Sequence, residues 1–176
     1  VIVRDTTGHA LAVLNERRSE FEQDPSGLRE VIREDLLPLI DMEYASRLVL
    51  GRAGRGASPE QVSAFATAMS EVLINRYADG LLAFNSTGQI EVLPLKGDQT
   101  EKLTRVRTRI RLANGSFAPV DFAFRKTEAG WRAFDITVEG ISYVITYRNQ
   151  LSPMVQQKGI DQVTADLLAG SIELGE

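Results

Sequence analysis

The sequence predicts an α+β domain in which an antiparallel sheet of at least four strands packs with helices that precede and follow it along the chain. Three observations predict this arrangement. Apolar residues recur at helical spacing through the first half, every second residue is apolar over much of 104–138, and helical spacing returns from residue 141. Helices and strands that are segregated along a chain are typical of the α+β class.

The N-terminal part predicts three helices. The first covers about Asp5 to Glu22, with Pro25 as its stop signal. Ser26 is the predicted N-cap of the second helix, which Pro38 should end or bend, and Asp41 can cap a short third helix. The predicted helical faces comprise Leu11, Leu14, Arg18 and Phe21 in the first helix, Leu28, Val31, Ile32, Leu36 and Leu37 in the second, and Tyr44, Leu48 and Val49 in the third.

The clearest helix start is the segment Ser58-Pro59-Glu60-Gln61, which follows a glycine- and arginine-rich loop over residues 51–56. A serine N-cap, a proline at the first helical position and a glutamine at the third form a capping box. The helix is predicted to run to about Leu82. Its apolar stripe comprises Val62, Phe65, Ala66, Met69, Val72, Leu73 and Tyr77.

The period then changes from 3.6 to two. Between Thr104 and Leu112 the even positions are apolar or threonine, and the odd positions are Arg105, Arg107, Arg109 and Arg111. This alternation predicts an antiparallel strand with one wet face, and we interpret the arginines as a solvated surface that pairs in part with Asp121.

Two more strands follow, and one precedes. Asn114-Gly115 predicts a tight turn, and the segment from Glu128 to Gly130 predicts another. An earlier strand over about Gln89 to Lys96 brings the sheet to at least four strands. The apolar positions are Val120, Phe122 and Phe124 in one strand and Phe134, Ile136 and Val138 in the next.

The chain finishes as helix. A helical segment starts with Ile141, Val144, Ile145 and Tyr147, and Ser152-Pro153 predicts a kink or a restart. A last short helix includes Ile160 and Leu167. The sequence contains no internal repeat, low-complexity tract or long linker, so residues 1–176 are expected to form a single domain.

The composition excludes several function classes. The 176 residues include no cysteine, which excludes a disulfide framework, a thiolate nucleophile and a cysteine zinc site. The formal charge of −4 argues against a broad nucleic-acid surface. No apolar run approaches the roughly 20 residues that a membrane-spanning helix needs. Because the sequence opens at Val1, we interpret it as a mature or trimmed chain, and targeting signals do not indicate its compartment.

Catalytic patterns are missing from the sequence as well. The single histidine, His9, is near the N-terminus, and no serine nucleophile elbow or metal-type spacing of His, Asp and Glu accompanies it. We therefore expect a protein that is not an enzyme and uses no metal or cofactor.

The apolar faces of three successive strands must be covered, and the flanking helices are the available covers. Periodicity alone leaves two arrangements open: a solid core between sheet and helices, or a cavity that holds a ligand.

One block of sequence narrows this choice. The run from Trp131 to Val144, continuing to Tyr147-Arg148, resembles the signature of the MlaC family, also called toluene-tolerance auxiliary proteins. Leu50-Gly51-Arg52 with the helix start at Ser58, and Lys158-Gly159-Ile160-Asp161, resemble the middle and C-terminal regions of that family. The likeness covers nearly the whole chain in the expected order.

The resemblance implies a periplasmic phospholipid-binding protein of a Gram-negative bacterium, without a cofactor, whose helices and sheet enclose an apolar lipid cavity. The resemblance also implies that the protein moves phospholipid between an outer-membrane lipoprotein–porin complex and an inner-membrane ABC transporter. This movement would maintain the lipid asymmetry of the outer membrane. A monomer without a nucleic-acid partner is expected. From parity and periodicity, the expected lipid-binding residues are Met69, Leu73, Val106, Ile110, Phe122, Phe124, Ile136, Val138, Val144 and Tyr147.

Two other hypotheses stay open. A small-molecule binding domain or enzyme of the NTF2-like sort also pairs a curved sheet with helices, but it would need polar groups inside its cavity. A structural or adaptor domain would have a solid core.

Overall fold

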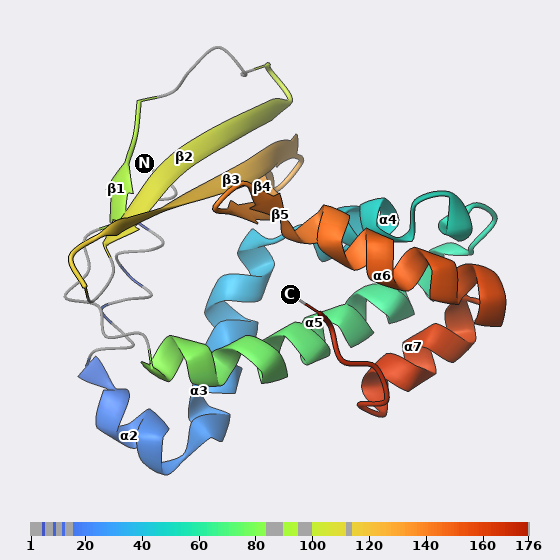
Figure 1. Cartoon of the computed structure of the whole chain (residues 1–176), viewed down its shortest axis with the longest axis horizontal. Helices are drawn as coiled ribbons and strands as arrows, with labels where there is room; N and C mark the ends of the chain where they lie inside the picture. Colours follow the sequence, from blue (N-terminus) through green and yellow to red (C-terminus); the bar gives the residue numbers. More distant parts are fainter. Residues whose placement is uncertain are drawn as a thin grey trace.

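The computed structural model describes residues 5, 9, 12, 16–83, 90–94, 100–111 and 114–175. A layer of helices lies to one side of a twisted sheet, and the chain passes from helices to sheet and back to helices (Figure 1). The helices are α2 (Arg18–Gln23), α3 (Pro25–Val31), α4 (Met42–Leu50), α5 (Pro59–Ala83), α6 (Tyr143–Lys158) and α7 (Ile160–Leu168). The strands are β1 (Ile90–Val92), β2 (Leu103–Arg111), β3 (Phe117–Thr127), β4 (Gly130–Val138) and β5 (Ile141–Ser142).

The five strands pair antiparallel in the order of the chain, β1-β2-β3-β4-β5, which confirms the predicted α+β class. The register places Val106 opposite Phe122 and Phe122 opposite Ile136. Because directly paired residues of antiparallel strands share a face, these three side chains form one apolar row across the sheet. The strand predicted over 89–96 is shorter in the structure, where β1 covers Ile90–Val92. Residues 89, 95 and 96 lie outside the described residues.

The opposite face of β2 is the solvated surface that the alternation predicts. Arg109 forms an ion pair at 2.6 Å with Glu91 of the neighbouring strand β1, and its guanidinium lies 4.5 Å from the centre of the Phe117 ring. Arg105 reaches Asp121 at 3.9 Å. Exposed pairs of this kind contribute little stability individually, so this face is solvated rather than structural.

A β-bulge interrupts the predicted alternation in β4. Ala123 pairs with Asp135 but Phe124 pairs with Ala133, which leaves Phe134 as the extra residue on β4. Simple alternation therefore does not continue through Phe134, although Phe134 and Ile136 line the same cavity. A bulge adds a residue and bends the strand, which redirects the side chains around it.

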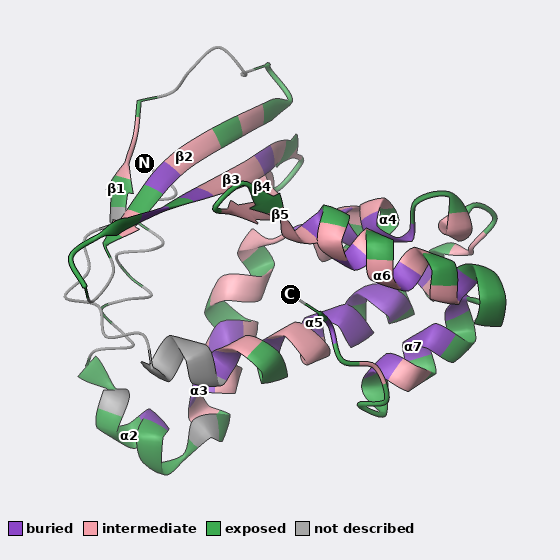
Figure 2. Ribbon diagram, viewed as in Figure 1, coloured by how far each residue is buried: buried purple, intermediate pink, exposed green. Residues whose placement is uncertain are grey.

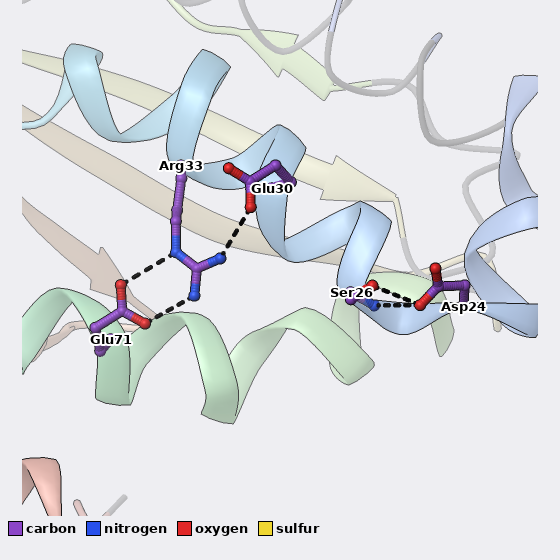
Figure 3. A network of polar contacts seen from close by, with 5 residues as sticks. All are labelled: Asp24, Ser26, Glu30, Arg33 and Glu71. Carbon is purple, nitrogen blue, oxygen red and sulfur yellow. Dashed lines mark hydrogen bonds and ion pairs between the residues drawn. The ribbon is translucent and has the colours of Figure 1, made fainter.

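The N-terminal helices correct the predicted cap of the second helix. The N-cap of α3 is Asp24 rather than Ser26, because the Asp24 carboxylate accepts from the Ser26 amide at 3.2 Å and from its hydroxyl at 2.5 Å (Figure 3). Pro25 thus starts a helix as well as stopping one, as proline does in a first helical turn. The predicted first helix is described only in part: Leu11 and Leu14 lie outside the described residues, and α2 contains Phe21.

The segment after α3 fastens the N-terminal region to α5. A π-helical turn (Ile32–Leu36) and a 3₁₀ turn (Leu37–Leu39) follow α3, so the helix changes form before it reaches Pro38. Arg33, in the π-helical turn, makes a two-pronged ion pair with Glu71 of α5 at 3.1 and 2.8 Å and also contacts Glu30 (Figure 3). The carboxylate of Asp41 then caps α4 through the Tyr44 amide at 3.1 Å, as predicted.

The capping box at the start of α5 is confirmed in both directions. Ser58 Oγ accepts from the Gln61 amide at 3.1 Å, and Gln61 Oε1 accepts from the Ser58 amide at 2.9 Å. The loop that precedes it includes a 3₁₀ turn (Gly51–Gly54). At the other end of the chain, the predicted helix start at Ile141 is wrong, because Ile141 lies in β5 and α6 begins at Tyr143 after the Ser142 cap. Helix α6 then runs without a restart through Pro153, whose side chain is exposed.

The two hydrophobic clusters of the described core are built from helices, while buried residues also occur in β2 and β3 (Figure 2). A large cluster joins α4, α5, α6 and α7, and a smaller one joins α2 and α3 to α5; within the described residues, neither includes a strand residue. Val106, Phe122 and Ile136 are only half-buried.

Candidate ligand cavity

A cavity lies where the helices meet the β4 side of the sheet. It has a volume of about 110 Å³, is partly open, and is walled almost entirely by apolar atoms. Strand β4 and helices α4, α5 and α6 all contribute to it. The lining residues are Ile40, Met42, Ala45, Ser46, Val49, Met69, Leu73, Ala133, Phe134, Asp135, Ile136, Tyr143, Val144 and Tyr147.

Half of the residues that the sequence suggests as lipid-binding line this cavity. They are Met69, Leu73, Ile136, Val144 and Tyr147. The other five lie on β2, β3 and the end of β4, outside the lining: Val106, Ile110, Phe122, Phe124 and Val138. They belong to the same sheet face as Ile136 or border it, so they extend the apolar surface away from the cavity.

Sequence reasoning missed the wall that α4 provides. Met42, Ala45 and Val49 recur at spacings of three and four, which is the signal that could have found this wall. On β4 the missed residues are Ala133, Phe134 and Asp135. These three residues directly precede Ile136 in the sequence. All four can border one cavity because the bulge interrupts the alternation of the strand.

Asp135 joins the sheet to the start of α6. Its carboxylate accepts from the Val144 amide at 3.1 Å, from the Ser142 hydroxyl at 2.5 Å and from the Ile136 amide at 2.8 Å. Ser142 itself caps α6 through the Ile145 amide at 3.2 Å. A carboxylate is favoured at a helix N-terminus, where unpaired amides and the helix dipole present positive charge. Asp135 therefore fixes the angle between two walls of the cavity.

A second brace joins the sheet to the start of α4. Asp41, 7% exposed, accepts from Arg125 at 2.6 Å, and its amide donates to the Ala133 carbonyl at 2.7 Å. The Arg125 guanidinium lies 4.2 Å from the centre of the Tyr44 ring, and Tyr44 packs edge-on against Phe134. The start of α4 is thereby held over the bulge.

Helix α6 also secures the far end of α4. Arg148 Nε donates to the Leu48 carbonyl at 2.6 Å, and the Ser152 hydroxyl donates to the Leu50 carbonyl at 3.1 Å. A cation near the C-terminus of a helix satisfies carbonyls that have no partner within the helix. Gly51, with φ at +55°, lets the chain turn past the Arg148 side chain.

Three tyrosines lie between α5 and α6 at one side of the cavity. The hydroxyls of Tyr77 and Tyr147 are 2.6 Å apart, and the Tyr143 ring stacks on Tyr77 with centroids 6.0 Å apart. Burial, followed by the hydrogen bond with Tyr77, raises the pKa of Tyr147 well above the ordinary value for tyrosine. Tyr147 is therefore neutral at physiological pH and adds no charge to the cavity wall.

The raised pKa predicts how stability depends on alkaline pH. Above about pH 10 an unfolded tyrosine loses its proton while the folded Tyr147 keeps it, so the free energy of unfolding should fall as pH rises. The maximum slope from this residue is about 1.4 kcal/mol per pH unit. Urea denaturation between about pH 8 and 11 checks this in wild type and in Tyr147→Phe. The wild type should lose more stability over that range, and equal losses would contradict the assignment.

The described residues contain no candidate metal centre. No group of three His, Asp or Glu side chains in that part of the chain could hold a metal ion, and His9 is exposed. Within the same residues, no helix combines the length and apolarity needed to cross a bilayer. The chemistry that the cavity offers is apolar burial.

The model of the family described as MlaC protein matches residues 4–169 of the chain. The chain belongs to the MlaC family. The resemblance seen in the sequence is thereby confirmed, and it covers both the helical and the sheet portions.

Two relatives align with most of the chain. The intermembrane phospholipid transport system binding protein MlaC of Haemophilus influenzae is 30% identical over 166 residues, covering 92% of this chain and 76% of that protein. The toluene tolerance protein ttg2D of Pseudomonas putida is 26% identical over 173 residues, covering 97% of this chain and 80% of that protein.

A solved structure shares the fold. The phospholipid-binding protein of Ralstonia solanacearum, whose structure is a complex with a phospholipid, matches with a TM-score of 0.70 at 22% identity. The match covers 93% of this chain and 97% of that one. The arrangement of helices and sheet is thus that of a known α+β fold.

Proposed function

We propose that this chain is a phospholipid carrier that shelters acyl tails in the cavity between β4, α4, α5 and α6. The observation that carries the proposal is an almost wholly apolar cavity in a member of the MlaC family. The names of the relatives support it, since one belongs to a phospholipid transport system and a protein of the same fold holds a phospholipid.

The proposed place of action is the periplasm of a Gram-negative bacterium. There the protein, as a single-domain monomer, moves phospholipid between an outer-membrane lipoprotein–porin complex and an inner-membrane ABC transporter. This transport maintains the lipid asymmetry of the outer membrane. Membership of the family supports this assignment.

The energetics favour tail recognition. Burial of hydrocarbon contributes about 0.8 kcal/mol per methylene, so two tails of about fifteen carbons represent on the order of 20 kcal/mol before offsetting terms. Ordering of the lipid and opening of the protein offset much of this. Apolar contacts do not distinguish head groups, so weak head-group selectivity is expected.

The cavity must enlarge to hold a tail. An engineered apolar cavity of roughly 150 Å³ accommodates one benzene molecule, and the volume here is about 110 Å³. We propose that tails extend from Ile136 along the apolar row that continues through Phe122 to Val106, with Ile110, Phe124 and Val138 beside it. These half-buried or buried side chains already present hydrocarbon next to the cavity.

Release into water would be slow because the tails would be exposed. Docking on a partner that offers a continuous apolar path is the expected release step. The sequence contains no nucleotide-binding motif, so a partner supplies any energy input. The chain itself acts as a binding protein rather than an enzyme.

Organic extraction of the purified protein, followed by mass spectrometry, tests the proposal. Near-stoichiometric phospholipid is expected, and its removal should lower the melting temperature because a ligand that binds only the folded state stabilises it. A polar metabolite instead of lipid would favour the NTF2-like small-molecule binding alternative. Absence of any ligand, in protein that also fails to take up phospholipid from vesicles, would favour a structural domain.

A further inference from the structure

Ser46 places an unsatisfied polar group in the wall of the apolar cavity. It lies on α4 beside Ala45, lines the cavity, and is 1% exposed. Its Oγ has no hydrogen-bond partner. A buried hydroxyl without a partner is unfavourable and uncommon in folded proteins, so this one calls for an explanation.

Two other buried helical hydroxyls are satisfied by their own helix. Ser70 donates to the Ala66 carbonyl at 2.8 Å, and Thr164 donates to the Ile160 carbonyl at 2.8 Å, in each case four residues earlier. This bond is the ordinary solution for serine or threonine within a helix. Ser46 differs from them in making no such bond.

Two further polar groups of the wall are already engaged. The Asp135 carboxylate accepts three hydrogen bonds, and the Tyr147 hydroxyl pairs with Tyr77. The Ser46 hydroxyl is therefore a buried donor that still needs an acceptor. Ser46 lines a cavity that must enlarge to hold a lipid, and a ligand that opens the cavity can supply the acceptor.

We infer that the Ser46 hydroxyl donates a hydrogen bond to the carbonyl oxygen of an acyl ester in the bound lipid. The inference rests on the proposed function. An acyl tail is hydrocarbon along its whole length, and the ester carbonyl that joins it to glycerol is its first strong acceptor. An ether-linked tail has no carbonyl, so Ser46 makes the cavity selective for ester-linked lipids.

Competition between two lipids tests this selectivity. Vesicles contain equal amounts of a diacyl phosphatidylethanolamine and its dialkyl ether analogue, with the same head group and chain length. After equilibration with delipidated protein, mass spectrometry gives the ratio of the bound lipids. One neutral hydrogen bond predicts about 3- to 10-fold enrichment of the ester form by wild type. In Ser46→Ala the enrichment should disappear.

Ser70→Ala is the matched control. It removes a buried serine hydroxyl from α5 that does not line the cavity, so the ester preference should remain at the wild-type level. Infrared spectroscopy adds a second measurement. The ester carbonyl stretch of bound lipid should lie at lower frequency in wild type than in Ser46→Ala, because a hydrogen bond weakens the C=O bond.

The inference is overturned if wild type binds both lipids equally, or if Ser46→Ala keeps the preference. Either result would show that the Ser46 hydroxyl does not select the ester linkage. Failure of wild type to bind either lipid is a separate outcome, because it overturns the proposed function itself.

Discussion

Replacement of Ile136 with aspartate is expected to abolish the co-purification of phospholipid. Ile136 lines the cavity from β4, and its neighbour across the sheet is Phe122. A carboxylate at this position would have to be desolvated beside hydrocarbon, at a cost far larger than the contribution of a few methylenes. Extraction and mass spectrometry of the purified variant measure the effect, with an expected loss of at least tenfold in bound lipid.

Ile141→Asp is the matched control for this variant. Ile141 follows the same strand by a tight turn and is 59% exposed, so the same chemical change there leaves the cavity wall intact. Circular dichroism should show that both variants keep their helix and sheet content. If Ile136→Asp carries as much lipid as Ile141→Asp, then this part of β4 does not contact the tails.

Replacement of Asp135 with alanine is expected to produce the largest loss of stability. The carboxylate accepts hydrogen bonds from the Ile136 amide, the Val144 amide and the Ser142 hydroxyl. Its removal takes the acceptor away from these three donors. We expect a loss of about 2–4 kcal/mol in the free energy of unfolding, from the hydrogen bonds and the interaction with the α6 N-terminus. For a chain of this length, that corresponds to a melting temperature lower by roughly 5–15 °C.

Asp135→Asn separates charge from hydrogen bonding. The amide keeps an acceptor oxygen of similar size but loses the negative charge, so its melting temperature should fall between those of wild type and Asp135→Ala. A melting temperature for Asp135→Ala within 1–2 °C of wild type, about half a kcal/mol at this chain length, would mean that the contacts at the α6 start contribute little.

Local signals in the sequence predicted much of the fold. The capping box at Ser58, the alternation in β2 and the turn at Asn114-Gly115 each depend on a few neighbouring residues, and the structure has all three. The mistaken cap at Ser26 has the same local origin, since Asp24 and Ser26 are both suitable cap residues and only the geometry decides between them.

The cavity was harder to predict because it depends on contacts between distant segments. Parity selects Val106 and Ile136 equally, yet only Ile136 lies where α4 and α6 approach the sheet. The bulge at Phe134 is a second reason, since one extra residue alters which side chains border the cavity without leaving a clear trace in the pattern. Ser46 is polar, so a search for apolar stripes passes over it.

Photocrosslinking with a phospholipid that carries a diazirine in its acyl chain tests the location of the tails most directly. Irradiation of the loaded protein, followed by digestion and peptide mass spectrometry, identifies the residues in contact with the tail. The expected labels fall on the segments of α4, α5, β4 and α6 that contain Val49, Leu73, Ile136 and Val144. Labels confined to the arginine-bearing face of β2, or no label on these four segments, would contradict a tail-binding cavity at this site.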